Sequence, residues 1–252
     1  MIVLNFHRIE SPTGVEITRL SPLRFSGVLD EVERVGNEPV QITFDDGFAS
    51  IAENGLPELQ RRGHSSIVFL ISGAMGGADA WDVRILGRSR PMMTWAIARQ
   101  WAVQGVIFGS HTCSHRDLTA LSPQSLREEI VSSRNEIEDR LGARVKQLSY
   151  PFGRHNQRVR DAAQDAGYEC AYAMRGMIGE RFAIPRVNVH SLMTTFELRR
   201  ILNGGAPSWR TGLFASLSTG TATVGNWRYI RGVKVQESVD ARRSPGDLHN
   251  LT

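Results

Sequence analysis

The feature that most constrains the fold of this chain is an alternation of short apolar runs with amphipathic stretches. The runs are five or six residues long, rich in β-branched and aromatic side chains, and show little polar alternation. These properties are typical of strands buried on both faces, and strand–helix alternation predicts a parallel sheet covered by helices. The predicted strands are Ile2–Phe6, Val40–Phe44, Ser66–Ile71, Val106–Ser110, Val145–Tyr150, Glu169–Ala173 and Arg186–His190.

Capping residues mark the predicted helices between these strands. Ser21-Pro22 and Ser122-Pro123 each place an N-cap serine before a proline at the first helical position. The second of these helices should end at Gly142, a residue typical of helix C-termini. Pro57 interrupts the helical pattern over residues 50–62, so we expect that helix to be kinked or split.

The 252 residues suffice for a single α/β barrel, although periodicity alone does not distinguish a closed barrel from an open sheet. No glycine-rich phosphate-binding motif follows any predicted strand, so nucleotide binding lacks its usual support. We expect a barrel domain over residues 1–204 and a C-terminal extension over residues 205–252. The extension is rich in Gly, Ser and Thr, which predicts partial disorder, while Trp209 and Trp227 suggest that part of it docks.

Charge and cysteine content narrow the classes of partner. The net charge is +4, and no Lys/Arg-rich block is present, which disfavours nucleic acid as a partner and suits an anionic glycan or a lipid-linked one. Cys113 and Cys170 are too few for a disulfide framework. The N-terminal apolar run is too short for a signal peptide or a transmembrane segment, so we expect a cytoplasmic protein unless an exported one was trimmed. The sequence does not indicate an oligomeric state.

Polar residues follow three of the predicted strands at the point where each strand ends. Asp45 and Asp46 follow the strand over residues 40–44, His111 and then His115 follow the strand over residues 106–110, and His7 follows the first strand. The C-terminal ends of parallel strands gather at one face of an α/β fold, where active sites form. We therefore expect these residues to converge.

The chemistry of the converging side chains indicates a metal site. Two adjacent carboxylates are costly to place together unless a cation compensates them. His111 and His115 are four residues apart, which would put both imidazoles on one side of a helical turn. Two imidazoles and one carboxylate leave open positions on Zn²⁺, and the second carboxylate could act as a base toward bound water. Each motif alone is often a coincidence or a turn, so the prediction depends on their joint placement.

Three motifs resemble those of a known family. Ile42–Gly47 reads ITFDDG, His111–His115 reads HTCSH, and Ser149–Gly153 reads SYPFG. In this order they are similar to the first three motifs of the polysaccharide deacetylases, the NodB-homology or family-four carbohydrate esterase proteins. The resemblance spans roughly Met1 to Leu202. It implies a distorted (β/α)7 barrel, a divalent metal, most commonly zinc, and removal of N-acetyl groups from a sugar in a polysaccharide or glycolipid precursor.

The resemblance also implies roles for individual residues. Asp45 would be the general base, and Asp46, His111 and His115 would be the metal ligands. The backbone N–H of Phe152 would help to hold the oxyanion.

Two further roles are open to alternatives: the general acid, and the arginine that would pair with the base and keep it ionised. Many family members carry the acid on a late histidine, here His190, while one branch that looks circularly permuted carries it near the N-terminus. The opening LNFHRI resembles that branch, so we predict His7. The third motif often begins with Arg, where this chain has Ser149. Arg186 is a candidate substitute, although it could equally form an ordinary ion pair.

Other functions fit part of this pattern. A cyclic amide or ureide could be hydrolysed by the same apparatus, in a narrow pocket rather than a groove lined by aromatic residues such as Trp81 and Trp95. A glycan-binding protein without activity would be expected to have lost one of the site residues. A non-haem iron oxygenase also uses two His and one carboxylate, but it does not need the second carboxylate.

Overall fold

A computed structural model of the chain describes residues 1–11, 17–35, 39–79, 90–174 and 176–206. An all-parallel eight-stranded sheet lies at the centre, in the order β10-β1-β4-β5-β6-β7-β8-β9. A separate parallel pair joins β2 (Arg8–Ile9) to β3 (Arg19–Leu20). The strands of the large sheet are β1 (Ile2–Phe6), β4 (Val40–Phe44), β5 (Ser66–Leu70), β6 (Ile107–Ser110), β7 (Gln147–Ser149), β8 (Cys170–Ala173), β9 (Ile184–Pro185) and β10 (Val187–Asn188).

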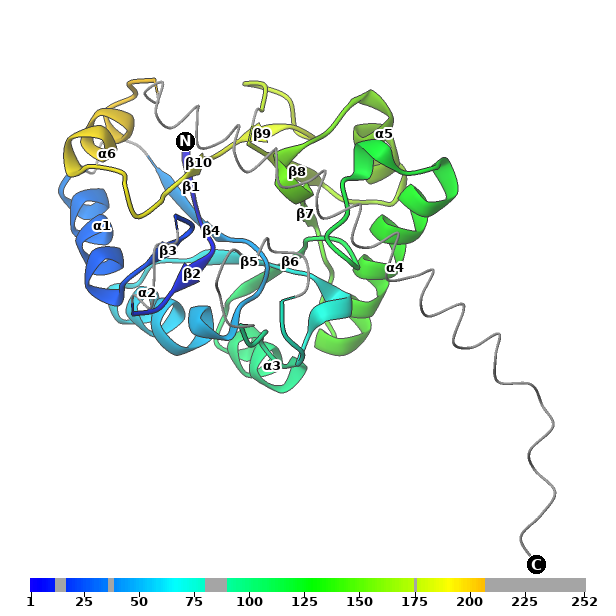
Figure 1. Cartoon of the computed structure of the whole chain (residues 1–252), viewed down its shortest axis with the longest axis horizontal. Helices are drawn as coiled ribbons and strands as arrows, with labels where there is room; N and C mark the ends of the chain where they lie inside the picture. The colour runs from blue at the N-terminus through cyan, green and yellow to red at the C-terminus, as the bar shows by residue number, and fades with distance from the viewer. Residues whose placement is uncertain (12–16, 36–38, 80–89, 175, 207–252) are drawn as a thin grey trace, which may run out of the picture.

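The two edge strands of this sheet belong to one stretch of chain. β9 pairs with β8 and β10 pairs with β1, and only Arg186 separates them. The stretch therefore lies between β1 and β8, and the sheet is an almost closed barrel (Figure 1). With β9 and β10 counted as one, the barrel has seven strands, which confirms the predicted distorted (β/α)7 architecture.

The closing stretch was predicted two residues too late, at Arg186–His190. Pairing begins at Ile184 and ends at Asn188. The β-branched alternation of the later residues favoured the wrong window. Pro185, which cannot donate to a ladder, is tolerated because it lies at the edge where β9 meets β8.

Helices surround the sheet on its outer side (Figure 1). The π-helix η1 ends where α2 begins, so the segment containing Pro57 is split, as predicted. Ser122 caps α4 by accepting the N–H of Ser125, and Gly142 ends this helix with a φ of 66°. The helices are α1 (Pro22–Val35), η1 (Ile51–Gly55), α2 (Leu56–Arg62), η2 (Ser72–Ala74), α3 (Trp95–Val103), η3 (Leu118–Ala120), α4 (Pro123–Leu141), η4 (Pro151–Gly153), α5 (Gln157–Asp165) and α6 (Thr195–Leu202).

An aromatic cluster fixes two strands whose C-terminal ends carry polar residues. The Phe6, Phe25 and Phe44 side chains are fully buried and join β1, α1 and β4. The ring centroids of Phe6 and Phe25 lie 5.1 Å apart, edge to face, and those of Phe25 and Phe44 lie 5.9 Å apart. Burying each such ring contributes about 1.5–3 kcal/mol to stability. His7 directly follows the first of these strands, and Asp45 directly follows the second.

Some predictions concern residues outside the described ranges. The C-terminal extension over residues 205–252 lies almost wholly outside them, as do Trp81, Trp209 and Trp227. Of the helices that the structure describes, none combines the length and the apolar character that a membrane span requires.

Candidate active site

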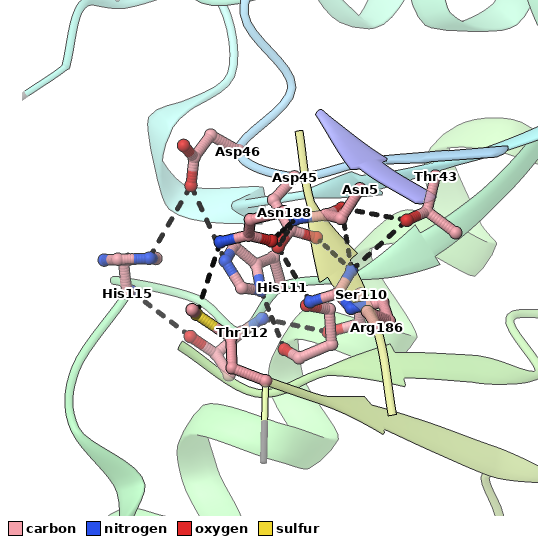
Figure 2. A network of polar contacts seen from close by, with 12 residues as sticks. Asn5, Thr43, Asp45, Asp46, Ser110, His111, Thr112, His115, Arg186 and Asn188 are labelled. Carbon is pink, nitrogen blue, oxygen red and sulfur yellow. Dashed lines mark hydrogen bonds and ion pairs between the residues drawn. The ribbon is translucent and has the colours of Figure 1, made fainter. Parts of the chain in front are cut away.

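Asp46, His111 and His115 meet beyond the C-terminal ends of β4 and β6. All three are buried, and one potential ligand atom from each lies within 4.8 Å of the others. Asp46 Oδ1 is 3.5 Å from His111 Nε2 and 3.6 Å from His115 Nε2 (Figure 2). Within the described part of the chain, this group has the composition and spacing to hold a metal ion. The structure thus brings together the three residues that the sequence predicted as ligands.

The segment from His111 to His115 is an irregular loop, so the prediction of a helical turn is wrong. Thr112 and His115 have φ values of 69° and 57°, in the left-handed region. The N–H of Thr112 donates to Ser110 Oγ, and the N–H of His115 donates to Thr112 Oγ1 (Figure 2). In this loop conformation the two imidazole centroids lie 4.8 Å apart. The two rings are therefore close together although the segment is not helical.

Backbone strain is concentrated at this site. Among the described residues, four that are not glycine have positive φ, namely Asp46, Thr112, His115 and Phe152. All four belong to the three motifs that the sequence singled out. A residue held in the left-handed region typically costs about 1–3 kcal/mol and persists where its surroundings over-determine it. The fold therefore holds these loops in costly conformations where the polar side chains converge.

The donor set fits a divalent metal ion. His111 Nδ1 lies 2.7 Å from the carbonyl oxygen of Ser149, a contact that requires Nδ1 to carry the proton. His111 Nε2, which faces Asp46, is then the acceptor nitrogen that could bind a metal. Burial lowers the pKa of His111, and it lowers that of His115 further with the help of His111. Both imidazoles are therefore neutral at pH 7, the form that binds metals.

Asp45 is held by partners outside the triad. Two guanidinium nitrogens of Arg186 donate to its two carboxylate oxygens, each at 2.8 Å, and Asn5 Nδ2 donates to Oδ2 at 3.0 Å. Burial is the largest single influence and opposes ionisation of Asp45, but the charge and hydrogen bonds of Arg186, together with His111 and His7, hold the pKa of this carboxyl below its usual range. Asp45 is therefore a carboxylate at neutral pH.

Arg186 reaches Asp45 from the closing stretch between β9 and β10. It also donates to Asn5 Oδ1 at 2.9 Å (Figure 2) and to Ser149 Oγ at 2.8 Å. The Phe69 and Tyr172 rings lie 5.5 and 5.7 Å from its guanidinium carbon. Its contact with Ser149 puts the guanidinium beside the position where the third motif often has Arg. Arg186 therefore forms a buried ion pair with Asp45 beside that position, a geometry compatible with both alternatives left open for it.

Phe152 lies beside the triad on the turn η4. Its ring centroid is 4.6 Å from that of His115, and its φ is 57°. The turn is fixed by the N–H of Gly153, which donates to the Tyr150 carbonyl at 2.8 Å, and by the Tyr150 hydroxyl, which donates to the Phe182 carbonyl at 3.0 Å. The third motif therefore converges with the first two.

The sequence model of the family described as polysaccharide deacetylase matches residues 33–171 of this chain. The chain belongs to the polysaccharide deacetylase family. The Bacillus subtilis protein YxkH, whose name places it in the same family, is 26% identical over 174 residues, which are 68% of this chain and 58% of that protein. This chain thus matches little more than half of the length of that relative.

Solved structures with the same fold cover most of this family member. IcaB from Ammonifex degensii has a TM-score of 0.66 and 19% identity, over 80% of this chain and 95% of that one. The deacetylase PplD from Streptococcus pyogenes, solved in complex with acetate, has a TM-score of 0.67 and 18% identity, over 82% and 98%. At these identities the likeness supports the barrel fold rather than a shared substrate.

The two candidate acids of this family member lie in different surroundings. His7 is partly buried, and burial lowers its pKa to about 4; Asp45, Arg186 and His111 all act on its charge. Burial also lowers the pKa of His190, but the charges that act there are Glu197 and Arg24, on α6 and α1. The electrostatic neighbours of His7 are thus residues of the candidate site, whereas those of His190 are residues of the surrounding helices.

Two other residues, Cys113 and Trp95, take ordinary structural positions in this family member. Burial raises the pKa of the Cys113 thiol to about 11, and its sulfur lies 3.7 Å from Ser72 Oγ, so it is a protonated thiol outside the triad. Trp95 packs partly buried against the core, with the Arg140 guanidinium 5.8 Å from its ring. Its packing gives no support to the predicted sugar-stacking surface.

The sequence pattern did not single out two polar residues inside the strands. Asn5 in β1 and Thr43 in β4 are fully buried, and Thr43 Oγ1 donates to Asn5 Oδ1 at 2.8 Å. Asn5 Nδ2 also donates to Asn188 Oδ1 at 2.8 Å, in addition to its bond to Asp45 (Figure 2). The available signal was an amide or hydroxyl within a strand otherwise suited to burial on both faces, since buried polar groups need partners.

Proposed function

We propose that this chain is a metal-dependent hydrolase that removes N-acetyl groups from an N-acetylated sugar in a polysaccharide or a glycolipid precursor. The observation that carries the proposal is that two adjacent carboxylates have different partners. Asp46 faces two imidazoles, while Asp45 faces a guanidinium. Membership of the polysaccharide deacetylase family supports the reaction class. The acetate bound to the Streptococcus pyogenes deacetylase is the acid that this reaction would release.

Asp46, His111 and His115 would hold the metal, for which zinc is our proposal. When bound at such a site, a divalent ion polarises a carbonyl group and lowers the pKa of water. His111 is oriented for this role by the Ser149 carbonyl, which fixes the tautomer of the ring.

The remaining residues move protons and stabilise charge. Asp45, kept ionised by Arg186, accepts a proton from the attacking water. The Phe152 N–H donates to the oxyanion that develops on the acetamide oxygen. His7 donates a proton to the departing amine. Its imidazole is neutral at rest, since burial lowers its pKa to about 4, so it first takes up a proton from solvent as negative charge develops on the substrate.

The direct test is to measure acetate released from an N-acetylglucosamine oligosaccharide by the zinc-loaded protein. We expect acetate and free amine in equal amounts, and loss of both when the metal is removed by a chelator. A cyclic ureide such as hydantoin, incubated in parallel, should remain intact. Ring opening of hydantoin without acetate release from the oligosaccharide would replace this proposal with the cyclic-amide alternative.

A further inference from the structure

A buried carboxylate on α4 contacts the loop between the two histidine ligands. Glu129 is only 7% exposed, and its Oε2 accepts the backbone N–H groups of Cys113 and Ser114, both at 3.0 Å. The Ser114 hydroxyl donates to Oε1 of the same carboxylate. Three donors from the short segment between His111 and His115 therefore converge on one side chain.

A second polar residue of α4 supports the start of the same loop. Ser133 lies four residues after Glu129, on the same side of the helix, and is fully buried. Its hydroxyl lies 2.7 Å from that of Ser110, which in turn accepts the N–H of Thr112. The neighbouring buried residues of this helix face include Leu126 and Ile130, so Glu129 and Ser133 interrupt an apolar face. The sequence pattern does not single them out, because glutamate and serine side chains are mostly exposed.

The loop needs such support. Thr112 and His115 both have positive φ, a conformation that an unrestrained chain would leave. Hydrogen bonds to an ionised carboxylate are roughly twice as strong as those between neutral groups. A carboxylate that satisfies two successive N–H groups and a hydroxyl opposes relaxation of this segment.

We propose that Glu129 is a positioning residue that holds the loop in the conformation in which both imidazoles face Asp46. The inference rests on the proposed metal-binding function of that triad. It predicts that the metal affinity of the protein depends on a side chain that does not touch the metal. Residues of this kind typically change metal affinity by about 10- to 100-fold when they are removed.

Four proteins test the role of Glu129: the wild type, Glu129→Ala, Glu129→Gln and, as a matched control, Glu128→Ala. Glu128 is the adjacent glutamate on the same helix and is exposed, where it bonds to Gln124. Zn²⁺ affinity is measured by competition with a chromophoric chelator, and the ligand geometry by the visible absorption of the Co²⁺-loaded proteins. The unfolding midpoint of each metal-free protein is measured as well.

We expect Glu129→Ala to lower Zn²⁺ affinity about 10- to 100-fold and to change the Co²⁺ spectrum. Glu129→Gln should lose much less, because its amide oxygen can accept both N–H groups and its amide nitrogen can donate to Ser114. Glu128→Ala should match the wild type. If Glu129→Ala does not fold, Glu129→Asp takes its place, because its carboxylate is one methylene too short to reach the loop.

The outcomes separate this inference from the proposed function. Wild-type affinity and an unchanged Co²⁺ spectrum in Glu129→Ala or Glu129→Asp, with only a lower unfolding midpoint, would mean that Glu129 merely stabilises the fold, and would overturn the inference. A wild-type protein that binds neither Zn²⁺ nor Co²⁺ would instead overturn the metal-dependent function itself.

Discussion

Asp45 and Asp46 are neighbours in the sequence but make different contacts. Asp46 has a φ of 73°, a turn of the backbone that directs its carboxylate toward His111 and His115. The carboxylate of Asp45 accepts hydrogen bonds from Asn5 in β1 and from Arg186. A one-residue difference at the end of a strand thus separates a candidate ligand from a candidate base.

The first prediction at this scale concerns Asp45→Asn. The amide is nearly isosteric with the carboxylate but cannot accept the proton of water, so turnover should fall by about 10²–10⁴-fold. Acetate release by the zinc-loaded variant measures this effect. Turnover within a few-fold of the wild type would remove Asp45 from the role of base.

The second prediction at this scale concerns the acid. His7→Ala should slow hydrolysis of an acetamido sugar by about 10²–10⁴-fold, since an amine cannot leave unprotonated. Hydrolysis of an activated acetyl ester, whose leaving group needs little help, should fall much less. His190→Ala is the matched control and should leave both rates nearly unchanged. Selective loss of amide hydrolysis in His190→Ala would return the role to the late histidine.

At the scale of elements, the closing stretch links the barrel to the site. Arg186 lies between β9 and β10, so the residue that joins the two edges of the sheet also pairs with Asp45. Its side chain is almost fully buried, as is that of Asp45. Removing one partner of a buried ion pair leaves an uncompensated charge, which costs far more than loss of an exposed pair.

Arg186→Met should therefore destabilise the protein by about 3–5 kcal/mol at pH 7. The double variant Arg186→Met with Asp45→Asn should recover part of this loss, because no charge is then left buried. Urea unfolding of the three proteins and the wild type measures both quantities. Additive losses in the double variant would show that the two side chains are not energetically coupled.

Sequence patterns predicted most elements because burial on both faces leaves a distinct apolar run for each strand. They placed the closing stretch two residues late, since its pairing is set by the two strands on either side rather than by its own composition. The motifs identified the triad, although the conformation of its loop depends on contacts from Glu129, far away in the sequence. The partner of Asp45 stayed an open choice for the same reason, because only the barrel closure brings Arg186 beside Ser149.

At the scale of the whole molecule, burying several histidines links stability to pH. The pKa of His7 falls from its ordinary 6.5 to about 4, and those of His111 and His115 are lowered too, in each case chiefly by burial. Between these values the unfolded chain binds protons that the folded protein does not. The contribution of these buried neutral histidines to the free energy of unfolding is complete above pH 6.5 and is lost as the pH falls toward 4.

The metal-free protein should therefore have a lower free energy of unfolding at pH 5 than at pH 7.5, with little change between pH 7 and 8. Urea unfolding across this range measures the slope, and His7→Gln should reduce it. Asp45 contributes in a lower window, because its pKa lies below its ordinary 3.8. Higher stability at pH 5 than at pH 7.5 would contradict the burial of neutral imidazoles.

The most direct test of the whole account is the metal content of the purified protein after loading with zinc and removal of the excess. The account predicts one zinc ion per chain in the wild type and in Asp45→Asn, and much less in Asp46→Ala and His111→Ala. That pattern is expected because Asp46 and His111 would bind the ion, whereas Asp45 would not. Equal zinc content in all four proteins, or loss of zinc from Asp45→Asn but not from Asp46→Ala, would contradict it.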